Sequence, residues 1–97
     1  MHYVYVLQDE ADAKRFYVGF TGDLMVRLVA HNEGRNASTR GRQWRIVYYE
    51  AYVSRDAPRR RESVLKHDGR SRRALMDRIK ASLTEDSLSK KVGEPPQ

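Results

Sequence analysis

The 97-residue sequence contains no cysteine, so it can form neither a disulfide framework nor a thiolate metal site. It also lacks a run of about 18 apolar residues, so no segment is expected to span a membrane. The first residues are typical of a β-strand and lack the apolar stretch of a signal peptide. These absences predict a soluble, cytoplasmic protein with no membrane among its partners.

The chain is also too short for two hydrophobic cores. Hydrophobic residues make up 39% of it, which is enough for one compact core. We therefore expect a single domain in residues 1–83. After residue 83 the sequence becomes polar and contains Gly93, Pro95 and Pro96, so residues 84–97 are predicted to form a disordered tail.

Acidic residues are scarce in the middle of the chain. Residues 35–80 contain 14 Lys and Arg against 5 Asp and Glu, a balance of +9, whereas the remaining residues contain 5 against 8, a balance of −3. Arg binds phosphate with paired hydrogen bonds, so an Arg-rich half suits a nucleic-acid partner. From charge alone, a solvated basic surface without such a partner is an equal alternative.

Three strands are expected. Residues 3–8 and 15–21 are rich in Tyr and Val and flank a polar, turn-like stretch, which predicts a hairpin. Residues 44–53 combine Trp, Ile, Val and Tyr and predict a third strand.

Three helices are expected from capping residues and apolar periodicity. Asp23 precedes an apolar helical stripe that ends at Gly34. A second helix is predicted from Asp56 to about His67, and a third is expected to be capped by Ser71. The resulting order, β-β-α-β-α-α, predicts a small α+β domain.

Two tyrosine motifs on the predicted hairpin carry the main functional signal. Residues 3–5 read Tyr-Val-Tyr and residues 17–19 read Tyr-Val-Gly. A hairpin can bring Tyr5 and Tyr17 side by side, and Gly19 lets a ligand or another backbone approach the second strand closely. Two strand tyrosines on their own are more often core or rim residues than catalytic ones.

Three charged or titratable residues follow on the predicted helices. Arg27 and His31 are four residues apart and share one helix face, and Glu62 lies in an Arg-rich run four residues before Lys66. Each also has an ordinary explanation. Arg27 can be a solvated helix residue, His31 can complement the helix dipole, and Glu62 can pair with Lys66.

Taken together, these residues resemble the GIY-YIG nuclease superfamily, and in particular its small stand-alone bacterial members related to the nuclease domain of the excision-repair incision subunit. The resemblance covers roughly residues 3–79. Tyr3 and Val4 stand where the first motif often has Gly and Ile. The resemblance implies a three-stranded antiparallel sheet flanked by helices. It also implies a metal-dependent endonuclease acting on nucleic acid, with DNA expected, in DNA repair or processing.

The resemblance also implies roles for individual residues. Tyr17, assisted by His31 or Tyr5, would take a proton from the attacking water, and Arg27 would bind the scissile phosphate. Glu62 would hold Mg²⁺ or Mn²⁺, which would stabilise the leaving oxygen. Some branches of the family carry an additional Asn ligand downstream of this Glu, and no Asn follows Glu62 here.

Nucleic-acid contacts are expected around these residues. Residues 36–43 form a polar, basic, Gly-containing loop of the kind that can wrap a phosphate backbone, although an ordinary mobile loop is the alternative. The predicted contact residues are Gly19, Thr39, Arg40, Arg42, Arg60 and Lys66.

Two other function classes stay open. One is a nucleic-acid-binding module that keeps the scaffold with little or no cleavage. The other is a structural interaction protein with a basic surface, which predicts a solvent-facing Glu62 and no convergence of the motif residues. Because the sequence offers no second, targeting domain, a protein partner for targeting is also expected.

Overall fold

The structure, a computed structural model, describes the backbone of residues 1–92 and the side chains of residues 1–84. The expected element order is confirmed. The elements are β1 (His2–Asp9), β2 (Phe16–Thr21), α1 (Leu24–Asn32), β3 (Trp44–Tyr52), α2 (Asp56–His67) and α3 (Gly69–Val92).

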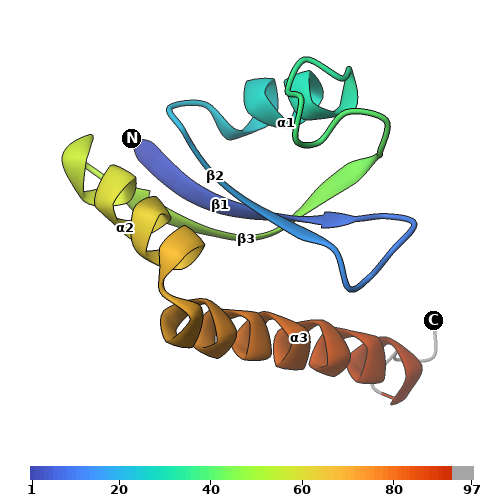
Figure 1. Cartoon of the computed structure of the whole chain (residues 1–97). Helices are drawn as coiled ribbons and strands as arrows, with labels where there is room; N and C mark the ends of the chain where they lie inside the picture. Colours follow the sequence, from blue (N-terminus) through green and yellow to red (C-terminus); the bar gives the residue numbers. More distant parts are fainter. Residues whose placement is uncertain (93–97) are drawn as a thin grey trace.

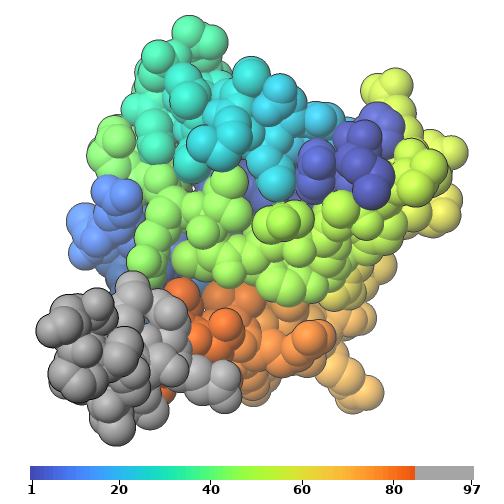
Figure 2. Space-filling view, turned by 180° about the vertical axis from the view of Figure 1, so that it is seen from behind, coloured from blue at the N-terminus to red at the C-terminus, as the bar shows by residue number. Residues whose placement is uncertain are grey.

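The three strands form one antiparallel sheet in the order β2-β1-β3. One face of the sheet is covered by α1, and the opposite face is covered by α2 and α3 (Figure 1). Because β1 is central and covered on both faces, it is buried along almost its whole length. Seen from behind, β3 forms an edge of the sheet between α1 and α3 (Figure 2).

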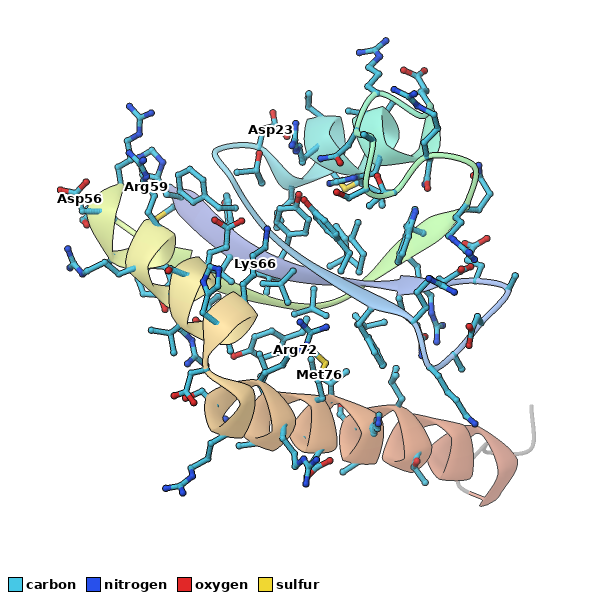
Figure 3. The ribbon with its side chains drawn as sticks, in the orientation of Figure 1. Asp23, Asp56, Arg59, Lys66, Arg72 and Met76 are labelled. Carbon is cyan, nitrogen blue, oxygen red and sulfur yellow. The ribbon has the colours of Figure 1, made fainter. Side chains whose placement is uncertain are left out.

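Each face of the sheet has its own hydrophobic cluster. The cluster beneath α2 and α3 is aliphatic and contains Val4, Val6, Val18, Leu65, Leu75, Met76 and Ile79. Met76 points from α3 toward the sheet (Figure 3). The cluster beneath α1 consists of Tyr5, Leu7 and Trp44, with Leu24 and Leu28 packed against it. Two of its three buried members carry polar groups, so this face must also satisfy buried hydrogen bonds.

The sequence predicted the capping residue correctly for α1 but not for α3. Asp23 caps α1 as expected, because its carboxylate accepts a hydrogen bond from the Val26 amide at 3.1 Å. Ser71 does not cap α3, so that expectation was wrong. The helix begins at Gly69, and the Asp68 carboxylate accepts from the Arg70 amide at 3.2 Å and from the Ser71 hydroxyl at 2.8 Å.

The last helix, α3, continues to Val92, into the range predicted as a tail. The disorder predicted for residues 84–97 stays a prediction. The rest of that predicted tail, residues 93–97, lies outside the described residues. None of the helices in the described part of the chain combines the length and the apolar character needed to cross a membrane.

Candidate active site

Tyr5 lies on the face of β1 that α1 covers, and only 2% of it is exposed. Gly19 is its partner across the β1–β2 ladder. A Cβ atom on Gly19 would lie 2.3 Å from both Cζ and the hydroxyl oxygen of Tyr5, so the absence of a side chain there makes room for the phenol. Gly19 is itself buried beneath this ring, so its role in the structure is to accommodate Tyr5, and its contact with nucleic acid stays a prediction.

The Tyr5 hydroxyl is held by two residues of α1. Its oxygen is 2.7 Å from Nε2 of His31 and accepts a long hydrogen bond, 3.4 Å, from Nε of Arg27. Burial raises the pKa of Tyr5 to about 12, with Arg27 opposing the shift. Tyr5 therefore keeps its proton at neutral pH, and Arg27 is fixed beside it.

His31 is fully buried between the sheet and the loop that follows α1. Its Nδ1 is 2.7 Å from the hydroxyl of Thr39, whose carbonyl accepts a 2.9 Å hydrogen bond from the Trp44 indole. Burial, with a smaller effect of Arg27, lowers the pKa of His31 below its ordinary value of 6.5. The imidazole is therefore neutral at pH 7.

Thr39 was predicted to contact nucleic acid, and that contact stays a prediction. In the structure the residue is fully buried and its hydroxyl is engaged by His31. Sequence reasoning missed this role. No periodic pattern links a loop threonine to a histidine eight residues earlier.

Tyr17 also lies beside the imidazole and is partly exposed. Its ring centroid is 5.0 Å from that of His31, in an edge-to-face arrangement. Asn36 Nδ2 is 3.5 Å from its hydroxyl, and Lys66 Nζ lies 5.1 Å from its ring centroid. The two motif tyrosines therefore meet at His31, but only Tyr5 forms a hydrogen bond with it.

Glu62 and Lys66 reach the same place from α2. Lys66 points from α2 toward the sheet (Figure 3), and its Nζ is 3.4 Å from Oε2 of Glu62. The negative charge of Glu62 is close enough to raise the pKa of Tyr5 slightly, although burial dominates that shift. The structure thus brings together six predicted residues, called the site cluster below: Tyr5, Tyr17, Arg27, His31, Glu62 and Lys66.

Glu62 is the one carboxylate of the site cluster. Within the residues that the structure describes, no three His, Asp or Glu side chains gather closely enough to share a metal ion. The side chain of Glu62 is 26% exposed and pairs with Lys66 through one oxygen. A partly exposed carboxylate of this kind fits Mg²⁺ or Mn²⁺, since Mg²⁺ accepts one or two protein carboxylates and completes its shell with water and phosphate oxygens.

Two of the predicted loop cations bind the protein itself. Arg40 donates from Nε to the Gly34 carbonyl at 2.9 Å, and Arg42 pairs with Asp9 at 2.8 Å. The Asp9 carboxylate is 1% exposed, and a hydrogen bond from the Ala11 amide and the nearby Arg42 lower its pKa. Both arginines thus anchor the loop while remaining exposed, and their contact with nucleic acid stays a prediction.

Tyr3 of the first motif lies outside the site cluster. It lines a surface groove of about 520 Å³ between α1 and β3, together with Leu24, Met25, Ile46 and Tyr49. None of the site-cluster residues lines this groove. The two tyrosines of residues 3–5 therefore have different surroundings, although they share a face of the strand.

Comparison with known proteins identifies related chains. The profile of the GIY-YIG catalytic domain matches residues 1–75. The UPF0213 protein CPE1444 of Clostridium perfringens is 32% identical over 94 residues, which cover 95% of this chain and 98% of that protein. The UPF0213 protein SpyM50708 of Streptococcus pyogenes is 41% identical over 66 residues, 66% of this chain and 70% of that protein.

A solved structure is similar as well. The solution NMR structure of the UPF0213 protein BH0048 from Bacillus halodurans matches with a TM-score of 0.53 and 31% identity, covering 91% of this chain and 94% of that one. This match confirms the predicted fold, and the family profile confirms the resemblance seen in the two tyrosine motifs.

Proposed function

Since this chain belongs to the GIY-YIG nuclease family, we propose that it is a metal-dependent endonuclease that hydrolyses phosphodiester bonds in nucleic acid, with DNA as the expected substrate. The convergence of the site cluster carries the proposal. A phenol on β1 lies within hydrogen-bonding reach of a guanidinium and a neutral imidazole on α1, and a carboxylate on α2 lies close enough to raise the pKa of that phenol slightly. A purely structural protein would not require that convergence.

Arg27 is proposed to bind the scissile phosphate. Tyr5 accepts from one of the five N–H groups of its guanidinium, and no other acceptor among residues 1–84 engages the rest, which can therefore bind phosphate oxygens. A cation held in advance stabilises the charge that builds up in the transition state and needs no reorganisation during the reaction. Tyr5 thus acts on the reaction partly by fixing Arg27.

The proton of the attacking water is proposed to pass to the Tyr5–His31 pair. With a pKa of about 12, Tyr5 is a poor source of free phenolate at neutral pH. The 2.7 Å contact supports a concerted route in which the Tyr5 oxygen takes the water proton while its own proton moves to Nε2 of His31. Tyr17, which we first expected to accept the proton, is assigned instead to positioning the water beside Lys66.

Glu62 is proposed to hold Mg²⁺ or Mn²⁺. A divalent cation bound there would supply positive charge to the leaving oxygen. The exposed cations nearby are proposed to bind the nucleic-acid backbone, and the candidates are Arg40, Arg42, Arg60 and Lys66. A role in DNA repair or processing and a targeting partner belong to the same proposal.

A nuclease assay tests this function directly. Duplex, branched and single-stranded DNA and RNA would be incubated with the protein and Mg²⁺ or Mn²⁺, and binding would be measured in parallel. Cleavage of at least one substrate that is lost in Arg27→Ala is the expected result. Binding without any cleavage would favour the binding-module alternative, and neither binding nor cleavage would favour a structural interaction protein.

A further inference from the structure

We infer that Thr39 is a positioning residue that fixes His31 in the neutral tautomer with its proton on Nδ1, so that Nε2 can accept the proton of Tyr5. The catalytic consequence rests on the proposed function. The tautomer itself is a property of the folded chain and can be measured without any substrate.

The argument starts from a continuous chain of buried hydrogen bonds. The Tyr5 oxygen is 2.7 Å from Nε2 of His31, and Nδ1 of the same ring is 2.7 Å from the Thr39 hydroxyl. The Thr39 hydroxyl is in turn 3.3 Å from the Asn36 carbonyl. Tyr5, His31 and Thr39 are each at most 2% exposed, so before substrate binds their hydrogen bonds are completed by protein groups and not by bulk water.

Counting protons along this chain selects one arrangement. A neutral imidazole carries one proton, and the two hydroxyls carry one each. If Nδ1 carries the ring proton, Tyr5 donates to Nε2, Nδ1 donates to Thr39, and Thr39 donates to the Asn36 carbonyl. Every proton then has an acceptor.

The opposite tautomer fails this count. With the ring proton on Nε2, Thr39 would donate to Nδ1 and Nε2 would donate to the Tyr5 oxygen. The Tyr5 hydroxyl proton would then lack an acceptor among the described residues, because its other neighbour, Arg27, is a donor. A buried donor without an acceptor is costly, so this arrangement is disfavoured.

The loop holds Thr39 rigidly in place. Its backbone amide donates to the Asn36 carbonyl at 3.2 Å, and its own carbonyl accepts from the Trp44 indole at 2.9 Å. Trp44 is fixed by Asn32, whose side chain accepts from the Trp44 amide at 2.7 Å and donates to its carbonyl at 3.1 Å. The hydroxyl of Thr39 is therefore set before any substrate arrives.

Nitrogen-15 NMR of the imidazole tests the inference on the intact chain. Long-range proton–nitrogen spectra distinguish the two neutral tautomers. His31→Gln identifies the His31 signals among those of the three histidines in the chain. The wild-type protein at pH 7 should show a protonated Nδ1 and an unprotonated Nε2 for His31.

Thr39 variants then separate positioning from packing. Thr39→Val keeps the side-chain shape but removes the acceptor for Nδ1, so each neutral tautomer then leaves one buried donor unpaired. The preference for the Nδ1-protonated form should therefore weaken, and part of the His31 population should shift to the Nε2-protonated form. On a substrate that the wild type cuts, kcat should fall on the order of tenfold with little change in KM. Thr39→Ser should restore both the wild-type tautomer and the rate, which a role in packing alone would not predict.

The inference is overturned if wild-type His31 carries its proton on Nε2 or is doubly protonated at pH 7, or if folded Thr39→Val keeps the wild-type tautomer. If the valine variant does not fold, the wild-type and serine spectra still decide the point. A protein that shows the predicted tautomers yet cleaves nothing would refute the proposed function while leaving this inference standing.

Discussion

The two sides of the sheet hold similar side chains in different arrangements. On the side of α2 and α3, Glu50 accepts hydrogen bonds from Tyr48 and Tyr52 and from both Nε and Nη2 of Arg61. These four residues are called the Glu50 cluster. Its carboxylate has an internal partner for each oxygen and is 17% exposed. In the site cluster, Glu62 has one partner within the part of the chain that the structure describes, Lys66, which it contacts through a single oxygen.

The difference lies in the free binding capacity of the carboxylate. Two phenols and one Arg occupy both oxygens of Glu50. The cluster therefore joins β3 to α2 and stabilises the fold. Among the described residues no partner engages the second oxygen of Glu62, and its side chain is 26% exposed, so it can serve a ligand. Cation and tyrosine neighbours occur in both clusters, and therefore do not by themselves distinguish a structural carboxylate from a functional one.

A raised tyrosine pKa does not make that distinction either. Tyr5 and Tyr52 both have pKa values raised to about 12. For Tyr5 the main cause is burial, whereas for Tyr52 it is the hydrogen bond donated to the Glu50 carboxylate. Their proposed roles differ because their hydroxyl groups have different partners. The Tyr5 hydroxyl contacts the neutral imidazole of His31, whereas the Tyr52 hydroxyl donates to the Glu50 carboxylate, whose two oxygens already have partners within the protein.

The largest expected effect is the loss of cleavage when a charged residue of the site cluster is substituted. Arg27→Ala and Glu62→Gln should each reduce the cleavage rate about a hundredfold or more, close to 3 kcal/mol of transition-state stabilisation. Arg27 would no longer stabilise developing charge, and Glu62 would no longer offer an anion to the metal. The readout is kcat/KM on a substrate that the wild type cuts, with circular dichroism as the control for folding. Wild-type rates in both variants would refute the site assignment.

A substitution in the Glu50 cluster should have the opposite effect: it should lower stability and leave the cleavage rate unchanged. Glu50→Gln is expected to lower the free energy of unfolding by about 2 kcal/mol, because Arg61 loses its charged partner in a mostly buried position. Cleavage per folded molecule should be unchanged. Urea denaturation at pH 7 measures the first quantity. A Glu50→Gln protein as stable as wild type would show that this cluster does not stabilise the fold.

The loss of stability in Glu50→Gln should depend on pH. Burial opposes ionisation of Glu50, but the hydrogen bonds from Arg61, Tyr48 and Tyr52 outweigh it and lower its pKa below the ordinary 4.5. A carboxylate with a lowered folded-state pKa contributes stability above its unfolded value and loses it as the pH falls through the folded value. The stability difference between wild type and Glu50→Gln should therefore shrink below about pH 4.5.

The next contrast is between the two tyrosines whose pKa values are both raised to about 12. Tyr5→Phe should slow cleavage about a hundredfold, the low end of what general acid–base catalysis contributes, since the proton route to His31 and the anchor of Arg27 are both lost. Tyr52→Phe should leave cleavage unchanged and cost about 1 kcal/mol of stability, the value of one hydrogen bond. Parallel cleavage and unfolding measurements decide the point. Equal losses of activity in both variants would erase the proposed distinction.

The smallest effect concerns two neighbouring arginines of α2. Arg60 is exposed, whereas Arg61 is tied to Glu50. Arg60→Gln should reduce the slope of log affinity for DNA against log salt by about one and leave stability nearly unchanged. Arg61→Gln should lower stability with little change in that slope. Fluorescence anisotropy across salt concentrations measures both, and a reversed pattern would contradict the assignment of Arg60 to the nucleic-acid surface.

The fold was largely predictable because its signals are local. Alternating Tyr and Val marked the strands, and the predicted bounds of α2 agree with the structure because both ends carry start and stop residues. The start of α3 was missed. Asp68 and Ser71 are both good caps, and the choice between them depends on how the chain leaves α2.

The site was predictable only where a motif marked it. Tyr5, Tyr17 and Arg27 follow from the spacing of two motifs and a helix face. The roles of the loop residues 36–43 could not be predicted in this way, because they depend on contacts with residues distant in the sequence. Arg42 looked like a free cation, yet its partner Asp9 is 33 residues away in sequence. Thr39 looked like a surface residue, but the fold buries it against His31.

A manganese titration followed by NMR tests the central claim most directly. Weak binding of Mn²⁺ is expected, because a lone carboxylate among cations binds a divalent ion tightly only when substrate phosphate is present. Line broadening of backbone amides should be centred on residues around Glu62. It should disappear in Glu62→Gln and persist in Glu50→Gln. Broadening centred on the Glu50 cluster or elsewhere, or broadening that survives in Glu62→Gln, would contradict the account.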